Sequence, residues 1–494
     1  MPALDIFLAA LVFMGALPLI AGCFQFGLAG MHCFRRRSHI EGDIYPRVAV
    51  VIPAWNEAAV IQRTLDQLAH LEYPSDRLRV YVVDDASTDG TPALLRAKAQ
   101  EYPGLVFPLR RERGGEGKSH TINHGLRRIR AEGWFDAVLV IDADVIFTAG
   151  SLRRMARHLA DPAVGAATAY IKEGSRPANY MNRFIAYEYI TAQAAARRAQ
   201  NVLGVHACLA GGAQLIRRES LEAVGGEIDT STLAEDTVTT FRIQLAGKRV
   251  VFEPNAIVWA EEPRGVDGLW KQRLRWARGN IQVTRLFRDV WLRPHRPGGL
   301  GRLSFGLIWF SILLMPVFLA SASTGLIALF LTNPTFAMHV FRGLWAINVI
   351  AYLFITLSSF SIDPQTGRSC WREGLMFPGI VSLLIMLYTV FPADFVTDGS
   401  ELLRDLNIQP SDGIGNVLTL FAYAWLTVSM LAAATVRQIE RHRGLAWICG
   451  PLVYAVGYGP LQCAITGTAY IKELRHAEMH WDKTEKVGAI GEVA

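Results

Sequence analysis

Cysteine is scarce in this sequence, with six residues among 494 and no pair at CxxC spacing. Such scattered cysteines exclude a zinc site of the usual pattern and a disulfide framework. Charged residues are also few, at 19% of the chain, and no internal repeat or low-complexity tract is present. The apolar share is 51%, which is high for a soluble protein and indicates a membrane protein.

Long uncharged runs are abundant instead. Each approaches or exceeds the roughly 20 residues that a helix needs to cross the apolar core of a bilayer. The run 374–393 leaves the topology open: five crossings place the C-terminal tail on the same side as the large polar region, and six place it on the opposite side. We favour five. The runs cover residues 6–31, 305–331, 343–360, 374–393, 417–434 and 445–471.

The first run predicts an uncleaved anchor, because it is too long for a signal-peptide core and follows Asp5 rather than a basic residue. Arg35, Arg36 and Arg37 follow it, and the positive-inside rule places them in the cytoplasm together with residues 38 to about 300. Although the net charge is +6, the basic residues gather near the ends of apolar runs, where anionic lipid headgroups explain them. The sequence therefore predicts a multi-pass protein of the plasma (inner) membrane that binds lipids and no nucleic acid.

Short β-branched runs alternate with amphipathic stretches between residues 47 and 262. Strands are predicted at 48–52, 80–83 and 137–141, and a helix over 56–69. This alternation predicts an α/β domain with parallel strands buried on both faces. Ligands of such domains bind beyond the carboxyl ends of the strands. Polar residues stand at these ends: Pro53, Ala54, Asn56 and Glu57 after the first strand, Asp84 and Asp85 after the second, and Asp142 and Asp144 after the third.

Two pairs of acids are candidates for ligand binding. Asp142 and Asp144 are separated by one small residue, so both carboxylates can reach one hard cation, Mg²⁺ or Mn²⁺, that also binds substrate phosphates. An ordinary polar turn gives the same Asp-x-Asp pattern. Asp84 and Asp85 follow four apolar strand residues and must be solvated or hydrogen-bonded there, for instance by a base or a ribose.

Three further motifs each have a functional and a structural interpretation. The glycine-rich segment that ends at Lys118 is either a phosphate contact or a solvated loop, since it lacks P-loop spacing. Glu235 and Asp236 either cap a helix, or Asp236 acts as a general base on an acceptor hydroxyl. The basic amphipathic stretch with Gln272, Arg275 and Trp276 can lie in the headgroup plane without any catalytic role.

Taken in order, these motifs resemble the processive family 2 membrane glycosyltransferases, which include hyaluronan, chitin, poly-N-acetylglucosamine and cellulose synthases. The resemblance covers residues 46–280. It implies a Rossmann-like GT-A domain, cytoplasmic and of α/β class, inserted between transmembrane α-helices. It also implies inverting transfer from a UDP-sugar, N-acetylglucosamine first and glucose second, onto a growing β-linked glycan that crosses the membrane. Possible further partners are accessory export or regulatory subunits.

The resemblance also implies a role for each matching residue. Asp236 corresponds to the catalytic base, with Glu235 beside it in Ala-Glu-Asp, and Asp142 and Asp144 to the metal-binding Asp-x-Asp. Cys208, Gly211 and Gly212 are similar, more loosely, to a stretch that lines the acceptor site. The remaining matches concern UDP and the glycan end: Pro53, Ala54, Asn56, Glu57, Asp84, Asp85, Lys118, Gln272, Arg275 and Trp276.

Two weaker similarities lie in the C-terminal half of the chain. The segment 481–485, Trp-Asp-Lys-Thr-Glu, is similar to a tail motif of bacterial relatives, and 395–399 loosely resembles the gating loop of cellulose synthase without its lysine. The predicted domains are an anchor (1–37), a GT-A domain (46–264), an amphipathic interfacial helix (265–300), a transmembrane bundle (301–474) and a polar tail (475–494).

Two rival functions remain at this point. One is transfer of a single sugar to a polyprenyl phosphate lipid, which needs neither the Gln-x-x-Arg-Trp motif nor several spans after it. The other is a non-catalytic membrane scaffold, against which the intact acids at positions 84, 85, 142, 144 and 236 count.

Overall fold

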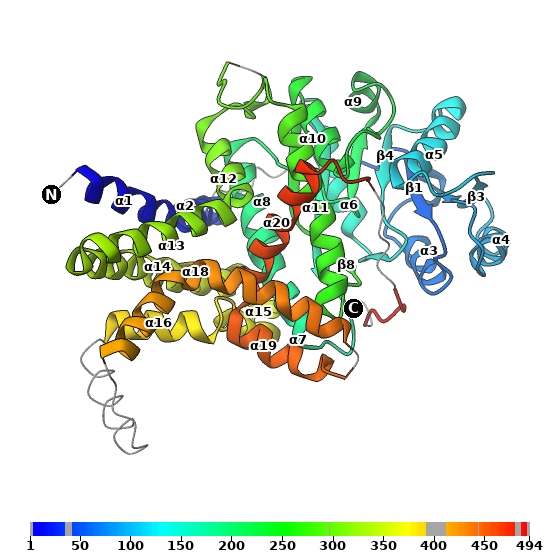
Figure 1. Cartoon of the computed structure of the whole chain (residues 1–494). Helices are drawn as coiled ribbons and strands as arrows, with labels where there is room; N and C mark the ends of the chain where they lie inside the picture. The colour runs from blue at the N-terminus through cyan, green and yellow to red at the C-terminus, as the bar shows by residue number, and fades with distance from the viewer. Residues whose placement is uncertain are drawn as a thin grey trace. The chain divides into compact units, whose positions relative to one another are not determined.

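The computed structural model of the chain describes residues 3–34, 42–295, 297–391, 412–442, 444–479 and 486–491. The segments 35–37, 395–399 and 481–485, on which predictions were made, lie outside these ranges. The chain divides into two compact units (Figure 1). The membrane-helix unit comprises Met1–Phe26, Gly265–Ala277 and Leu307–His476, and the α/β unit comprises Gly27–Arg264, Arg278–Gly306 and Ala477–Ala494.

The α/β unit contains an eight-stranded sheet with strand order β3-β2-β1-β4-β7-β6-β8-β5. The three strands expected from the sequence, β1, β2 and β4, are parallel as predicted. The sheet as a whole is mixed, because β7 runs antiparallel to β4 and to β6, and β5 antiparallel to β8. The strands are β1 (Val48–Ala54), β2 (Leu78–Asp84), β3 (Val106–Arg110), β4 (Ala137–Val140), β5 (Val145–Phe147), β6 (Val164–Glu173), β7 (Gln214–Arg217) and β8 (Arg249–Ala260).

The centre of the sheet is buried on both faces. Alternate residues of β1 and β2, such as Val51 and Val83, pack with Ile122 and Leu126 of α5 (Lys118–Glu132) in one core cluster. Because successive side chains of a strand point to opposite faces, the intervening residues lie on the other face, on the side of α3 and α4 (Figure 1). The other helical segments of this unit are α3 (Ile61–Ala69), α4 (Thr91–Glu101), α6 (Ser151–Ala156), α7 (Tyr180–Tyr189), α8 (Ala196–Leu203), α9 (Arg218–Ala223), α10 (Glu235–Leu245), the π-helix η3 (Ile190–Ala195), and the short turns η1 (Ser75–Arg77), η2 (Arg157–Ala160) and η4 (Pro297–Gly299).

The helix predicted over 56–69 begins later than expected. Helix α3 starts at Ile61, because Asn56 has a positive φ of 53° and its side chain is used elsewhere. Its Oδ1 accepts a hydrogen bond from the backbone N–H of Thr88 at 2.8 Å. The residues after β1 therefore form a turn that is fastened to the loop after β2.

The membrane-helix unit has four helices long and apolar enough to cross a membrane, or up to six if two bent pairs each count as one span, among the residues described. The four segments are Leu17–Phe34, Met315–Thr332, Pro334–Ile362 and Asn416–Arg441. Its helices are α1 (Ala3–Met14), α13 (Met315–Thr332), α14 (Pro334–Ile362), α15 (Pro364–Leu375), α16 (Ile380–Val390), α18 (Asp412–Arg441), the turn η5 (Ala446–Ile448), α19 (Cys449–Val456) and α20 (Tyr458–Leu474). Three helices contribute to both units: α2 (Leu17–Phe34), α11 (Val266–Leu286) and α12 (Leu303–Leu313).

Three apolar runs that the sequence presents as continuous are broken. The run 6–31 divides into α1 and α2 near Gly15, where a Cβ would lie only 2.7 Å from the Cβ of Ala322. The run 445–471 divides between Ala446–Val456 and Tyr458–Leu474, at 100°. The run 374–393 breaks after Leu375, the last residue of the more polar helix Pro364–Leu375, which meets Ile380–Val390 at 77°. Gly379 and Gly457 stand at these bends with φ of 88° and 104°, a conformation open to glycine and costly for other residues.

Glu253 provides a prediction about the stability of the α/β unit. Burial by itself would raise the pKa of this carboxyl group, but hydrogen bonds from His158, the Asn255 amide and Arg157 outweigh it and lower that pKa to about 2. A carboxyl group whose pKa is lower in the folded state stabilises the fold at every pH above its unfolded pKa, here near 4.5. The stabilisation is about 3 kcal/mol at neutral pH and is lost as the pH falls towards 2.

We therefore expect Glu253→Gln to lower the melting temperature at pH 7 and to differ less from the unmodified protein as the pH falls below about 4.5. Thermal unfolding at several pH values measures this. Glu222→Gln, at an exposed ion pair with Arg218, is the control and should change little. An equal loss at pH 7 and pH 3.5 would contradict the assignment.

Candidate active site

The loops after β1 and β2 are fastened to each other at the carboxyl edge of the sheet. The register pairs Ala54 with Asp84, so both strands end side by side. The N–H of Asn56 donates to Ser87 Oγ at 2.8 Å, and the N–H of Glu57 donates to Thr91 Oγ1 at 2.8 Å. Pro53 lies within β1 opposite Val83. The structure thus brings these predicted nucleotide-site residues together at one edge.

Asp84 and Asp85 are both buried, with 2% and 5% of their surfaces exposed, and both are paired. Asp84 accepts a hydrogen bond from the N–H of Ser87 at 3.0 Å and lies 3.0 Å from a guanidinium nitrogen of Arg110. Asp85 forms an ion pair with Arg111 and accepts from the N–H of Gly115 at 3.0 Å. Neither arginine was singled out from the sequence. Arg110 is the last residue of the neighbouring strand β3, and Arg111 follows it.

Gly114 shows why the loop before Lys118 is rich in glycine. A Cβ at Gly114 would lie 2.2 Å from the carbonyl oxygen of Asp85, so a side chain is excluded there. Gly117 has a φ of 107° directly before α5 begins at Lys118. The loop therefore packs closely on the end of β2 and starts a helix whose first residue points into the site.

Lys118 joins two of the predicted acids. Its Nζ lies 2.5 Å from Asp142 Oδ1 and 3.6 Å from a carboxylate oxygen of Glu235. Burial alone would lower the pKa of Lys118, but the negative charges of Asp142, Glu235 and Asp236 outweigh it and raise that pKa. The lysine is consequently a permanent cation at neutral pH, placed between the Asp-x-Asp segment and the start of α10.

Asp142 is subject to opposing effects on the pKa of its carboxyl group. Burial raises the pKa of its carboxyl group, the charge of Lys118 lowers it, and the nearby charge of Asp144 raises it again. The net direction is upward. Such a carboxylate is stabilised by any further positive charge that arrives at the site.

Gly211 and Gly212 lie beside the acids. A Cβ at Gly211 would lie 3.2 Å from Asp236 Oδ2 and 3.5 Å from Lys118 Nζ. A Cβ at Gly212 would lie 2.7 Å from Val145 and 3.6 Å from Asp142 Oδ2. The two glycines, loosely matched from the sequence, therefore pack closely against the acids: a side chain at Gly212 would clash with Val145, and one at Gly211 would crowd Asp236.

Asp236 is held at the first turn of α10. Its Oδ1 accepts a hydrogen bond from the N–H of Thr237 at 2.8 Å within that turn, whereas the N-cap residue is Ala234, which has no side-chain cap hydrogen bond. The residue is half-buried, whereas Glu235 is 4% exposed. Burial and then the charge of Asp236 raise the pKa of the Cys208 thiol well above its ordinary value, which keeps the thiol protonated.

Arg197 was missed by sequence reasoning. It lies on α8 with 8% of its surface exposed and donates to the carbonyl oxygen of Ala169 at 3.1 Å. Burial lowers the pKa of its guanidinium, and the negative charge of Asp236 acts in the opposite direction. No local pattern distinguishes this arginine from its neighbour Arg198, because only the folding of α8 against β6 brings it near Asp236.

The donor set around Asp142 and Asp144 suits a divalent cation shared with a ligand. Asp144 Oδ2 lies 2.7 Å from Nζ of Lys486, a residue close to the C-terminus. Within the described part of the chain, no group of three or more His, Cys, Asp or Glu side chains is placed to hold a metal by itself. Two carboxylates fit Mg²⁺ or Mn²⁺, which commonly take few protein ligands and complete their shell with phosphates and water.

The Gln-x-x-Arg-Trp residues lie on α11, in the part that belongs to the membrane-helix unit. Gln272 is buried and its Oε1 accepts a hydrogen bond from Arg273 at 2.6 Å, while Arg273 stacks over the ring of Trp276 at 4.0 Å. Trp276 is 36% exposed. The role of Gln272, Arg275 and Trp276 at the donor site stays a prediction.

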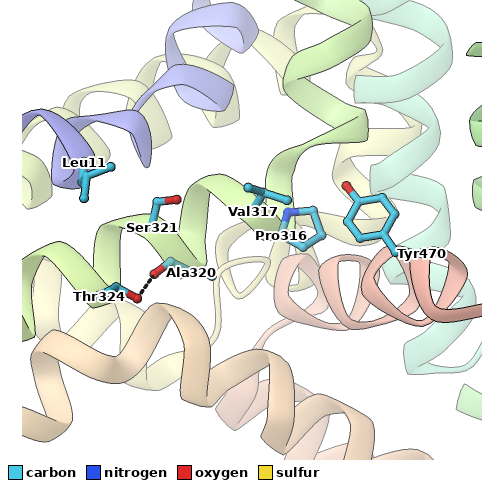
Figure 2. A pocket seen from close by; sticks show the side chains of 7 residues that line it. All are labelled: Leu11, Pro316, Val317, Ala320, Ser321, Thr324 and Tyr470. Carbon is cyan, nitrogen blue, oxygen red and sulfur yellow. Dashed lines mark hydrogen bonds between the residues drawn. The ribbon is translucent and has the colours of Figure 1, made fainter. Parts of the chain in front are cut away.

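A groove of about 430 Å³ lies in the membrane-helix unit between α1, α13 and α20 (Figure 2). Two of the three hydroxyl groups of its lining are used internally: Thr324 Oγ1 donates to the carbonyl oxygen of Ala320 at 2.9 Å, and the Tyr470 hydroxyl donates to that of Leu313. The groove is therefore mainly apolar. It is lined by Leu11, Pro316, Val317, Ala320, Ser321, Thr324 and Tyr470.

Comparison with known proteins identifies the family of the chain. Residues 46–279 match the family model described as glycosyltransferase like family 2. A probable glycosyltransferase of Bacillus subtilis, YdaM, is 30% identical over 330 residues, which are 64% of this chain and 75% of that protein. The chain belongs to glycosyltransferase family 2. The enzymatic class predicted from the sequence is thereby confirmed.

Other family 2 relatives have different products in their names. Beta-monoglucosyldiacylglycerol synthase of Synechocystis is 29% identical over 404 residues, 82% of this chain and 74% of that protein. Poly-beta-1,6-N-acetyl-D-glucosamine synthase of Staphylococcus aureus is 27% identical over 259 residues, 52% of this chain and 60% of that protein. The names of these relatives thus include both a glucosyldiacylglycerol synthase and a poly-N-acetylglucosamine synthase.

A solved structure supports the GT-A fold. The mannosyltransferase of Pyrobaculum calidifontis, in complex with GDP-Man and Mn²⁺, superposes with a TM-score of 0.56 at 24% identity. The match covers 74% of this chain and 99% of that chain. The fold predicted from the sequence, a GT-A domain in a chain with apolar helices that could span a membrane, is confirmed by this likeness and by the helices described above.

Gly211→Ala tests the space in front of Asp236. The new methyl group would lie 3.2 Å from Asp236 Oδ2, closer than ordinary van der Waals contact, and would occupy the approach to that oxygen. We expect at least about a tenfold lower kcat, since misplacing reacting groups by an ångström costs up to two orders of magnitude, with an unchanged melting temperature. Gly30→Ala, where no atom lies within 4 Å, is the control. Full activity of Gly211→Ala would show that the space is not used.

Proposed function

We propose that this family 2 glycosyltransferase is a processive, inverting enzyme that polymerises a UDP-sugar into a β-linked polysaccharide and passes it across the membrane. The observation that carries the transfer step is the convergence of Lys118, Asp142, Glu235 and Asp236, with Gly211 packed beside them. The donor sugar we propose is N-acetylglucosamine or glucose, in keeping with the names of the relatives. The catalytic domain is proposed to face the cytoplasm.

In the proposed mechanism, Asp236 takes the proton from the acceptor hydroxyl as that oxygen attacks the anomeric carbon of the donor. The bond between this carbon and the diphosphate oxygen breaks, and UDP leaves with the electron pair. Inversion follows from attack on the face opposite the leaving group. A bound Mg²⁺ or Mn²⁺ would supply positive charge to the departing diphosphate.

The other residues orient the reactants. Lys118 holds Asp142 and Glu235 in fixed positions and contributes a buried positive charge, which has its largest effect where negative charge develops. Asn56, Asp84 and Asp85 shape the strand ends where such domains bind nucleotides. Arg275 and Trp276 are proposed to approach the leaving diphosphate and the glycan end, on the basis of the family motif alone.

Extension of a polymer, rather than a single transfer, is supported by the Gln-x-x-Arg-Trp motif and by the several apolar helices that follow it. The test is UDP release by the full chain in lipid, with a panel of UDP-sugars and Mg²⁺ or Mn²⁺, and with the products sized. A long polymer from one donor would establish the proposal and identify the sugar. No turnover with any donor would contradict it.

A second candidate is transfer of one sugar to a lipid acceptor. It is favoured by the apolar groove of the membrane-helix unit, whose lining suits an acyl chain better than a polar glycan, and by the extensive match to a diacylglycerol glucosyltransferase. The same assay distinguishes the two, because a lipid that carries one sugar, extractable into organic solvent, would replace the polymer.

A further inference from the structure

The residues 486–491, here called the C-terminal strap, lie against the α/β unit, to which they belong. Glu261, 3% exposed, accepts hydrogen bonds from two consecutive strap amides, Val487 N–H at 3.0 Å and Gly488 N–H at 2.9 Å. Ile490 forms an antiparallel bridge with Ser175. A buried carboxylate with both oxygens used in this way fixes the strap at its start, and the bridge fixes it further on.

Further contacts hold the strap at close range. The N–H of Gly491 donates to the carbonyl oxygen of Gly174 at 3.1 Å, and Arg63 donates to the carbonyl oxygens of Ile490 and Gly491. Gly488 has a φ of 73°, and a Cβ there would lie 2.6 Å from the carbonyl oxygen of Ala59. The position of the strap is therefore determined by residues that take no part in the proposed chemistry.

The first residue of the strap reaches the proposed donor site. Lys486 Nζ lies 2.7 Å from Asp144 Oδ2, with side chains 15% and 14% exposed, and it also donates to the carbonyl oxygen of Glu261. Asp142, two residues earlier, is paired with Lys118 instead. Each carboxylate of the Asp-x-Asp segment thus has its own lysine, one from the start of α5 and one from the far end of the chain.

We propose that Lys486 is a positioning residue of the donor site, held in place by the strap so that it orients the Asp144 carboxylate. The inference rests on the proposed function, in which Asp144 contributes to binding of the nucleotide diphosphate with its cation. A carboxylate with a fixed partner is pre-organised in one rotamer, while one without it must be ordered when the ligand binds. Glu261 and Gly488 act one step further away, by holding the strap.

The decisive measurement is calorimetric titration of the full-length protein in lipid with UDP in the presence of Mn²⁺, together with Mn²⁺ binding followed by electron paramagnetic resonance. We expect Lys486→Met to weaken UDP binding at least about tenfold, and Lys486→Arg to restore it to within about threefold. Val487→Ala is the matched control, because its side chain is 64% exposed and the substitution leaves the amide that Glu261 binds. Equal binding by Lys486→Met and the unmodified protein would overturn the proposal.

A cross-link tests whether the docked strap positions the donor site or blocks ligand binding. Ser175 and Ile490 are directly opposed in an antiparallel bridge, and such pairs have Cα separations within the range a disulfide spans. With both replaced by cysteine and oxidised, the locked strap should leave UDP and Mn²⁺ binding unchanged. Loss of binding that a reductant reverses would show that the strap must leave, which overturns the proposal.

Different results would contradict the proposed function and the role of Lys486. If the unmodified protein binds no UDP with Mn²⁺, the proposed function is contradicted and the role of Lys486 falls with it. If the unmodified protein binds UDP and Lys486→Met binds it equally well, only the role of Lys486 is contradicted. Formation of the same Ser175→Cys/Ile490→Cys cross-link in the Lys486→Met background shows that the strap is still docked when the affinity is measured.

Discussion

Asp236→Asn is expected to reduce UDP release about 10²- to 10⁴-fold, the range typical for loss of a general base. An amide does not accept the proton of the acceptor hydroxyl, yet its oxygen still accepts the 2.8 Å hydrogen bond from Thr237 N–H. Lys118 keeps Asp142 and Glu235 as partners. The fold and UDP binding should therefore persist, and the loss should lie in kcat.

Steady-state UDP release with the preferred donor measures this effect, and calorimetric titration with UDP confirms that the nucleotide site is intact. The control is Asp161→Asn, at a surface ion pair with Arg249 whose side chains are 44% and 56% exposed. Turnover by Asp236→Asn within threefold of the unmodified enzyme would exclude Asp236 as the base.

Lys118→Met is expected to affect stability and activity together. The substitution removes the cation from between Asp142 and Glu235 and leaves two acids close together in a largely buried site. Removing one partner of a fully buried pair costs about 3–5 kcal/mol, and the loss here should be smaller because the Asp142 side chain is 36% exposed. We expect a clearly lower melting temperature and at least about a hundredfold loss of turnover, since a donor of positive charge aimed at developing negative charge is worth about 10²–10³ in rate.

A double substitution distinguishes loss of the ion pair between Lys118 and Asp142 from a general destabilisation of the fold. Lys118→Met combined with Asp142→Asn should be more stable than Lys118→Met alone, because the remaining site then has one fewer unpaired charge. Lys118→Arg retains the charge and should recover most of the stability. If the two substitutions simply add, with no coupling between them, the contact between Lys118 and Asp142 has no energetic importance.

Local pattern was sufficient for the centre of the fold. β-branched runs such as 48–52 predicted parallel strands that the structure contains, because strands buried on both faces need continuous apolar side chains. The same reasoning placed Asp84 and Asp142 at strand ends, since strands in one parallel sheet end at one edge. The helix predicted over 56–69 was wrong for residues 56–60. Helical periodicity is present there, but the Asn56 side chain binds the loop after β2, and these residues form a turn.

The apolar runs show a similar limit. Composition determined that 445–471 is a stretch fit for a membrane, because hydropathy depends only on the side chains present. It did not determine that the helix bends by 100° at Gly457, where a Cβ would lie 2.5 Å from the Pro378 backbone. The bend results from the close approach of two segments that are far apart in the sequence.

The sequence by itself indicated the apolar segments that could span a membrane, the parallel strands β1, β2 and β4, and the acids at their carboxyl ends, because these depend on residue type and local spacing. Tertiary structure alone decided that Lys118 lies between Asp142 and Glu235, that Gly211 packs beside Asp236, and that Lys486 contacts Asp144. The physical reason is that each of these contacts joins segments many residues apart. The packing of the whole α/β unit determines which of these residues meet, and no periodic pattern along the chain predicts these contacts.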